Sequence, residues 1–499
     1  MWLRGLIMSD ARGLPGALPG VEDAVPMTRE SPPTENLLDR TWSSLRQVLR
    51  DIAVRRNIDA FEPRPGLPEA DAEFVREQLR ACLEARGGEV SARARAVTLG
   101  RAYLALNATG RKRYLHILGD EFSTDRAAVD AAVERLRAAS TPEERQSAEE
   151  ALRAALQAPR LKLLTQFNAL PDGVKFLVDM RAELMEFGKS DPGLRGLEAD
   201  LKRLLASWFD IGFLELRRIT WRSPAALLEK LIVYEAVHEI RGWTDLKNRL
   251  DSDRRCYAFF PPRMPDEPLI FVEIALVSGM AGNVNQLLDE NSPVEDPEAA
   301  DAAIFYSISN AQKGLSGISF GNFLIKRVAS DLAREFKNLK TFATLSPIPG
   351  FMRWLKPKLA EAGDALLTEG ERRGLAEALP PGGEGDLLTR ALATPDWHRR
   401  EPLCNAMKAP LMRLCAQYLL QEKRGVRALD PVAHFHLSNG ARMERLNWLG
   451  DVSGNGMRQS AGMMINYLYR LDHIEANHEA YSDEGRIAVS SAIRGLAKG

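Results

Sequence analysis

Cysteine is scarce in this sequence. The 499 residues include only 4 cysteines, no two of which form a Cys-x-x-Cys pair: Cys82, Cys256, Cys404 and Cys415. The spacing therefore indicates neither a disulfide framework nor a cysteine zinc site, and a reducing compartment is expected.

Long apolar runs and an excess of charge of one sign are also missing. Charged residues interrupt every apolar run before it reaches the ~20 residues of a membrane-spanning helix. The 67 Lys and Arg residues balance 68 Asp and Glu residues, which leaves no basic excess to attract nucleic acid. The segment Met1–Met8 lacks a signal-peptide pattern, so we expect a cytoplasmic protein. The interrupted apolar runs and the balanced charge lead us to expect that it binds neither membrane nor nucleic acid.

The composition otherwise suits a globular protein, with 45% hydrophobic and 27% charged residues. Residues 1–36 are rich in Gly, Pro, Glu and Ser without periodicity, which predicts a disordered tail. Residues 37–192 are rich in Ala, Leu, Arg and Glu with apolar residues at helical spacing, which predicts an all-helical bundle domain. Within it, Thr141 followed by Pro142 and Glu144 indicates a helix start with a capping box.

A second domain is predicted over 193–499. The segment Ser190–Gly193 (SDPG) interrupts the helical pattern, and after one further apolar helical stripe short strands and helices alternate. Residues 269–277 and 302–308 predict strands, and residues 323–336 predict an amphipathic helix. This pattern is typical of an α/β or α+β fold.

A glycine-rich turn from Gln312 to Gly321 lies between that second strand and the amphipathic helix. Glycines allow the backbone to approach an oxyanion closely, and free N–H groups at a helix N-terminus favour phosphate. Lys326 and Arg327 could add positive charge. The turn is neither a Walker A loop nor a GxGxxG fingerprint, so glycines that merely permit a tight turn are an equal alternative.

Two further segments carry candidate catalytic side chains. Ser346 follows a strand-like run and precedes two prolines, where open α/β sheets often place active groups, although a serine that caps its own turn is the alternative. His434 and His436 share one face of a predicted strand that precedes an Asn439-Gly440 hairpin, where one of them could titrate near neutrality beside a site; an ordinary core or surface histidine is the alternative. His-x-His occurs at metal centres, but no partner ligands lie at characteristic spacing, and no metal is expected.

Taken together, several ordered segments resemble malonyl-CoA decarboxylases. They are FYSIS (305–309), GNFLIKRV (321–328), LSPIPGF (345–351) and FHLSNGA (435–441) followed by LNW (446–448). The likeness covers most of the chain after Pro192, and the preceding helical region also looks like the N-terminal domain of that family.

The resemblance implies an α+β protein in which an N-terminal helical domain precedes a catalytic domain of the GNAT (GCN5-related acetyltransferase) fold. It places the catalytic serine on Ser346, the catalytic histidine on His436, and substrate contacts on Ser307, Tyr469 and Asn439. Where some relatives carry an acidic residue, this chain has Ser319, so no carboxylate role transfers there. The implied CoA-binding residues are Gln312, Lys313, Gly314, Leu315, Ser316, Gly317 and Gly321.

The implied reaction converts malonyl-CoA to acetyl-CoA and CO2, as in fatty acid metabolism. Ser346 would orient the malonyl carboxylate and His436 would protonate the enolate, with no metal or organic cofactor. The helical domain would mediate self-association, and a homotetramer is expected. The alternatives are an acyl-CoA dependent acyltransferase of the same fold and a non-catalytic acyl-CoA sensor.

Overall fold

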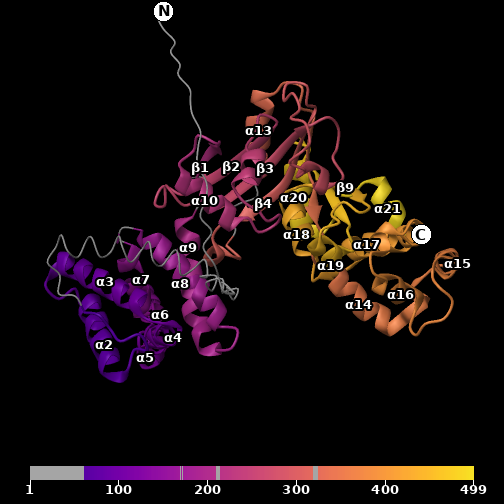
Figure 1. The fold of residues 1–499 in the computed structure, drawn as a ribbon. Coiled ribbons are helices and arrows are strands. Elements are labelled where there is room, and N and C mark those ends of the chain that lie inside the picture. The colour runs from indigo at the N-terminus through magenta and orange to yellow at the C-terminus, as the bar shows by residue number, and fades with distance from the viewer. Residues whose placement is uncertain (1–60, 169, 171, 210–213, 319–323, 499) are drawn as a thin grey trace, which may run out of the picture.

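The computed structural model describes residues 61–168, 170, 172–209, 214–318 and 324–498. The predicted tail over 1–36 lies outside these residues. Figure 1 shows a lobe of helices, then a central sheet, then a second group of helices beyond the sheet. The predicted α+β class, with a helical region preceding a mixed-sheet domain, is confirmed.

The first lobe consists of helices joined by short connections. Thr141 caps its helix as predicted: its hydroxyl accepts from the Glu144 N–H, and the Glu144 carboxylate accepts from the Thr141 N–H. The last helix of the lobe, α9 (Arg195–Trp208), packs against α8 (Gly173–Phe187) and α7 (Pro159–Asn168). The first strand of the sheet begins after α9. The helices are α2 (Glu69–Leu83), α3 (Gly88–Ala105), α4 (Ala108–His116), α5 (Arg126–Ala138), α6 (Pro142–Leu156), α7 (Pro159–Asn168), α8 (Gly173–Phe187) and α9 (Arg195–Trp208).

The sheet has the order β1-β2-β3-β4-β5-β10-β6, with β9 also paired to β10. Among the described strands of this sheet, β4 and β5 pair in parallel and the other pairs are antiparallel. The strands are β1 (Glu215–Ile219), β2 (Arg254–Phe260), β3 (Ile270–Val277), β4 (Ala302–Asn310), β5 (Thr341–Thr344), β6 (Ser346–Pro347), β9 (Arg442–Asn447) and β10 (Met464–Leu468).

The pairing of β4 with β5 is short, and this creates the opening for a site. The two strands are in register only from Ala302 opposite Thr341 to Phe305 opposite Thr344. From Tyr306 to Asn310, β4 continues with β3 on one side only. The other edge of this stretch therefore keeps backbone groups that no described strand uses.

Helices surround the sheet. The predicted amphipathic helix is α13 (Leu324–Glu335), whose buried residues Leu324, Val328 and Leu332 face the core at helical spacing. The others are α10 (Ala225–Tyr234), α11 (Trp243–Arg249), α12 (Val284–Leu287), α14 (Phe351–Ala362), α15 (Glu369–Ala378), α16 (Leu387–Ala393), α17 (Glu401–Gln421), α18 (Pro431–Ser438), α19 (Gly454–Ser460), α20 (Ile474–Glu484) and α21 (Ser491–Lys498).

One prediction about local structure is wrong. The segment that begins at Ala433 and carries His434 and His436, expected as a strand, lies in helix α18 (Pro431–Ser438), and Asn439-Gly440 ends this helix instead of forming a hairpin. Asp430 caps the N-terminus, Pro431 occupies the first turn, and Gly440 has φ +77° at the C-terminal end. These are the residues that start and stop a helix, and they outweigh the strand-like alternation between them.

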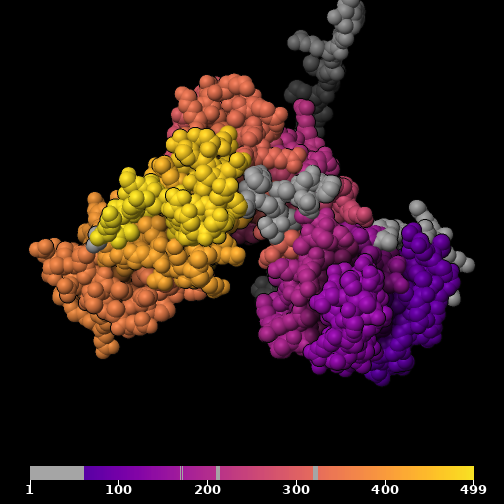
Figure 2. Space-filling model, turned by 180° about the vertical axis from the view of Figure 1, so that it is seen from behind, coloured from indigo at the N-terminus to yellow at the C-terminus, as the bar shows by residue number. Residues whose placement is uncertain are grey.

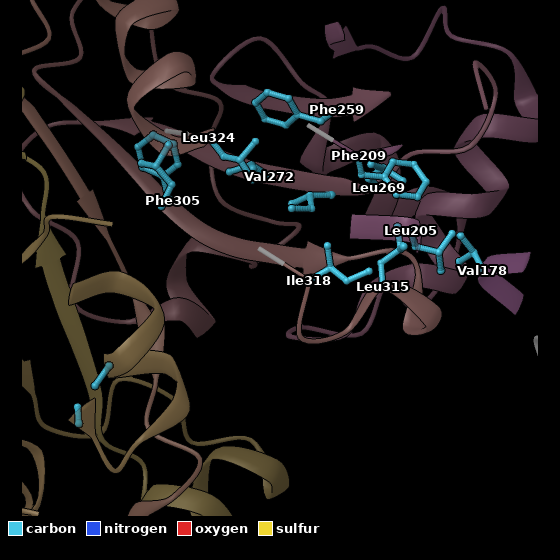
Figure 3. Packing of buried hydrophobic residues seen from close by; sticks show 14 of the residues in the cluster. Val178, Leu205, Phe209, Phe259, Leu269, Val272, Phe305, Leu315, Ile318 and Leu324 are labelled. Atoms are coloured by element: carbon cyan, nitrogen blue, oxygen red, sulfur yellow. The ribbon is translucent and has the colours of Figure 1, made fainter. Parts of the chain in front are cut away.

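The largest hydrophobic core runs without a break from the helical lobe into the sheet. Val178 and Leu205 of the lobe belong to the same buried cluster as Val272 and Phe305 of the sheet, as Figure 3 shows. Seen from behind, the two groups of helices project on either side of an open space (Figure 2). No helix in the described part of the chain has the length and apolar character needed to cross a bilayer.

Candidate active site

A cavity of about 240 Å³ lies between the free edge of β4 and helix α18. Its polar side chains are Ser346, His436 and Asn310, and no Lys or Arg lies among the described residues that line it. The remaining lining residues are Val237, Ile270, Phe305, Tyr306, Ile308, Pro347, Pro431, Val432 and Phe435. A ligand in this cavity would meet the hydrogen-bonding side chains of Ser346, His436 and Asn310 among mainly apolar residues.

Ser346, His436 and Tyr469 form one hydrogen-bonded line at the cavity. Ser346 Oγ lies 3.0 Å from His436 Nε2, and His436 Nδ1 lies 2.8 Å from the Tyr469 hydroxyl. These residues come from β6, from α18 and from the end of β10, and the serine and the histidine are 90 positions apart in the chain. The fold thus brings together three of the side chains that the sequence singles out.

Two neighbours hold this line in place. The Ser346 hydroxyl donates to Thr344 Oγ1 at 2.8 Å, and Thr344 Oγ1 also accepts from the Tyr467 N–H at 3.2 Å. The Tyr467 ring stacks on the His436 imidazole with 4.4 Å between ring centres. The imidazole is therefore fixed in orientation before any ligand arrives, and the Ser346 oxygen is held beside it.

Helix α18 positions the histidine through its two ends. The Asp430 carboxylate accepts from the N–H groups of Val432, Ala433 and Gly350. At the other end, the Asn439 side chain donates to the Phe435 carbonyl at 2.7 Å. Asn439 is therefore placed as the cap of the helix that carries His436, and it is not among the residues that line the cavity.

Burial decides the charge of the histidine. His436 is 3% exposed, and removal from water lowers the pKa of its imidazole to about 3. Burial also raises the pKa of the Tyr469 phenol, which keeps its proton. Because the Ser346 hydroxyl donates to Thr344, its oxygen accepts from His436, which places the ring proton on Nε2 and leaves Nδ1 to accept from the phenol.

Ser307 lies in β4 but faces a different polar group. Its hydroxyl donates to the Glu235 carboxylate at 2.8 Å and contacts the Ser309 hydroxyl at 3.2 Å. Glu235 also accepts from the N–H groups of Val237 and His238, which fixes the loop that lines the cavity with Val237. The structure does not bring the Ser307 side chain to the cavity, and its predicted substrate contact stays a prediction.

The glycine turn follows β4, as expected, and packs against the helical lobe. Gln312, Gly314, Leu315 and Ile318 are buried, whereas Lys313, Ser316 and Gly317 are exposed. Gly321 lies outside the described residues. Lys326 pairs with Glu475, and Arg327 donates to the Leu214 carbonyl, so both of these cations already have protein partners.

Several residues of the site have no distinct signal in the sequence. Thr344 and Tyr467 look like ordinary strand residues, and Glu235 lies in an unremarkable segment. Asp430 did have a signal, because Asp before Pro is a common helix start.

His434, two residues from His436, turns away and contacts the Tyr481 hydroxyl at 3.0 Å. Within the described ranges, no three His, Cys, Asp or Glu residues cluster as a metal site.

The chain is similar to known proteins over most of its length. The sequence profile of the malonyl-CoA decarboxylase C-terminal domain matches residues 212–499, and that of the N-terminal domain matches residues 122–209. The chain is 41% identical over 347 residues to the mitochondrial malonyl-CoA decarboxylase of Anser anser anser, covering 67% of this chain and 69% of the relative. It is also 41% identical over 362 residues to that of Rattus norvegicus, covering 70% and 73%.

Solved structures give the same result. The malonyl-CoA decarboxylase of Rhodopseudomonas palustris superposes with a TM-score of 0.78 at 42% identity, covering 87% of this chain and 100% of the other. That of Agrobacterium vitis gives a TM-score of 0.74 at 41% identity, with 85% and 99% covered. The two profiles, the relatives and the shared fold together show that this chain belongs to the malonyl-CoA decarboxylase family of carboxy-lyases.

Proposed function

We propose that the chain converts malonyl-CoA to acetyl-CoA and CO2 in the cavity between β4 and α18. The observation that carries this proposal is the pair of Ser346 and a neutral His436 in a mainly apolar cavity whose described lining residues include no Lys or Arg. The pair can orient a carboxylate and return a proton, which are the two tasks that decarboxylation of a thioester requires.

Substrate binding would use the free edge of β4 and the serine. The acyl thioester lies along Tyr306–Asn310, where β4 has backbone groups that no described strand uses. The Ser346 hydroxyl turns from Thr344 to the malonyl carboxylate and holds the carbon–carbon bond perpendicular to the thioester plane. In that orientation the bonding electrons can pass into the thioester carbonyl as CO2 leaves.

The walls of the cavity favour loss of the charged group. A carboxylate here faces Phe305, Ile308 and Val432, and the described lining residues include no Lys or Arg to neutralise it. Leaving water for such walls is costly for the anion, whereas CO2 is apolar and uncharged. The charge moves onto the thioester oxygen as the bond breaks, so the environment opposes the ground state more than the products.

Proton return would use His436. After CO2 leaves, the enolate carbon takes the proton from Nε2, and the Tyr469 hydroxyl at Nδ1 stabilises the charge left on the ring. Water restores the ring proton after acetyl-CoA leaves, so each turnover consumes one proton. The thioester itself accepts the electron pair, and we therefore propose that no metal or organic cofactor takes part.

We further propose a homotetramer in the cytoplasm. The helical lobe leaves Val90 and Leu156 exposed, and apolar side chains of this kind can contribute to contacts between copies. Light scattering on the purified chain would give the mass: a tetramer agrees with the proposal, and a monomer contradicts it.

The test uses malonyl-CoA labelled at the free carboxyl, with released CO2 and acetyl-CoA both quantified. The chain, Ser346→Ala and His436→Ala are compared with His434→Ala, a matched control that removes the neighbouring imidazole of the same helix. We expect equal amounts of CO2 and acetyl-CoA from the unmodified chain. Loss of one acid–base group typically costs about 10²–10⁴-fold in rate, so both site variants should fall by that order.

Each alternative has its own outcome in this assay. Full activity in both site variants would contradict the assignment of the site. An acyltransferase would release CoA without CO2 when amines are added, and a sensor would bind malonyl-CoA without turnover. Either result would contradict the decarboxylase proposal for this chain.

A further inference from the structure

We propose that Lys202, on helix α9 of the helical lobe, binds a phosphate group of the CoA moiety at the glycine turn. This inference rests on the proposed function for its ligand. The helical lobe would then contact the CoA part of the substrate directly, although the cavity for the acyl part lies in the other part of the chain.

The turn is held by the helical lobe along its buried side. The guanidinium of Arg181, on α8, donates to the carbonyl oxygens of Gly314 at 2.6 Å and Ser316 at 2.9 Å. Gly314 approaches α8 so closely that a Cβ there would lie 1.7 Å from the Val178 carbonyl oxygen. Leu315 and Ile318 lie beside Val178 and Leu205 (Figure 3). The carbonyl groups of Gly314 and Ser316 thus point toward the lobe.

The opposite side of the turn is exposed and presents donors. Gly317 has φ +72°, a conformation that glycine adopts without strain, and no described group accepts from its N–H. Lys202 reaches this side from α9, because a Cβ on Gly317 would lie 3.3 Å from Lys202 Nζ. Lys313 is exposed on the turn itself. Two ammonium groups from two parts of the chain therefore border one open stretch of backbone.

The charge of Lys202 is not balanced within the described residues. Its ammonium forms no ion pair there, although the side chain is half-buried. Glu198 is one helical turn before it on α9, but that carboxylate pairs with Arg181 at 2.7 Å. A half-buried cation without an anion partner, beside an open glycine turn at the end of β4, is an arrangement that suits a phosphate.

The experiment separates the phosphate contact from the rest of the substrate. Binding of CoA and of pantetheine, which lacks the phosphates, is measured by calorimetry for the full chain and for Lys202→Ala, Lys202→Glu and Lys202→Arg. Arg195→Glu is the matched control, because Arg195 is exposed on the same helix and has no contact with the turn in the described structure. Thermal unfolding of each variant is recorded alongside.

We expect Lys202→Ala to weaken CoA binding about tenfold, which is the size of a charge-assisted hydrogen bond, and Lys202→Glu to weaken it further. Lys202→Arg should retain most of the affinity, pantetheine binding should not change, and Arg195→Glu should resemble the unmodified chain. Malonyl-CoA turnover should show a raised KM with kcat nearly unchanged.

Three results would overturn the inference: CoA affinity unchanged in Lys202→Glu, an equal weakening for pantetheine, or the same loss in Arg195→Glu. Release of CO2 by the unmodified chain is measured separately and reports on the proposed function alone. Binding of CoA does not require turnover, so failure of the decarboxylase assay leaves the Lys202 measurement interpretable.

Discussion

The imidazole of His436 has a different neighbour at each nitrogen, and this asymmetry sets its chemistry. Tyr469 occupies Nδ1 and Ser346 occupies Nε2. Because burial keeps the ring neutral, one nitrogen must donate and the other must accept. The Tyr469 phenol donates to Nδ1, so Nε2 carries the ring proton. Tyr469 therefore acts as a positioning group that directs this proton toward the cavity.

Replacing Tyr469 with phenylalanine should therefore lower kcat while KM for malonyl-CoA changes little. Loss of a group that orients a catalytic imidazole commonly costs about 10–100-fold, and we expect a loss of that order. Tyr481→Phe is a matched control, since Tyr481 makes the corresponding contact with His434 away from the cavity. Steady-state kinetics of both variants test this prediction, and an unchanged kcat in Tyr469→Phe would contradict the positioning role.

The lowered pKa of His436 also predicts how stability depends on pH. Below the ordinary histidine pKa of about 6.5, the unfolded chain takes up a proton that the folded chain binds only near pH 3. The free energy of unfolding should therefore fall as the pH drops from 6.5 toward 3, and this contribution should vanish above 6.5. Urea unfolding of the chain and of His436→Asn at pH 7 and pH 5 tests this.

The variant lacks the titrating ring, so between those two pH values it should lose about 2 kcal/mol less stability than the unmodified chain. Equal losses in the two proteins would show that His436 is not the buried neutral group described above. The pH 7 values serve as the reference for any effect of the substitution itself.

Among the elements, helix α18 shows what could and could not be predicted from the sequence. The strands at 270–277 and 302–310 and the helix at 324–335 agree with their patterns, since their apolar spacing follows a single period. In α18, the alternation around His434 and His436 suggests a strand, whereas Asp430-Pro431 and Gly440 determine a helix. The residues that start and end this helix therefore predicted its structure better than the short alternation between them.

The site itself could be predicted only in part. Ser346, His436 and Tyr469 followed from a family resemblance, and the structure places them within hydrogen-bond distance of one another. The support from Thr344 and the stacking of Tyr467 depend on how β5 and β10 pair, which no local pattern specifies. Long-range pairing of strands is the information that a single sequence does not display.

At the same scale, Asp430 should matter for both stability and rate. Asp430→Ala removes the acceptor of three backbone N–H groups and of the Tyr418 hydroxyl. We expect a loss of about 2 kcal/mol or more in the free energy of unfolding, with a lower kcat because α18 carries His436. The measurements are chemical unfolding and turnover.

Asp386→Ala provides the comparison, because Asp386 caps α16 away from the cavity. It should cost about 1 kcal/mol and leave turnover unchanged. If the two variants lose activity to the same degree, the effect is general destabilisation and the special role of the α18 cap is wrong.

At the scale of the whole molecule, the two parts meet at the glycine turn. Gly314→Ala would place a methyl group against the backbone of α8, which cannot yield as a side chain can. We expect a loss on the order of 1–3 kcal/mol in stability together with a raised KM for malonyl-CoA. Gly374→Ala, inside helix α15 with open space around it, should leave KM unchanged and raise stability by about 0.5–1 kcal/mol, because alanine favours a helix interior. Unfolding and kinetics on both variants provide the test.

The contact between Arg181 and Gly314 joins residues 133 positions apart. A ribosome adds about 5–20 residues per second, so α8 is made roughly 7–27 s before the turn that covers it. During that interval Val178 and its neighbours present an apolar helix face without its partner. Chaperones, or other nascent chains on the same messenger RNA, can therefore bind this apolar face until β4 and the glycine turn have emerged from the ribosome.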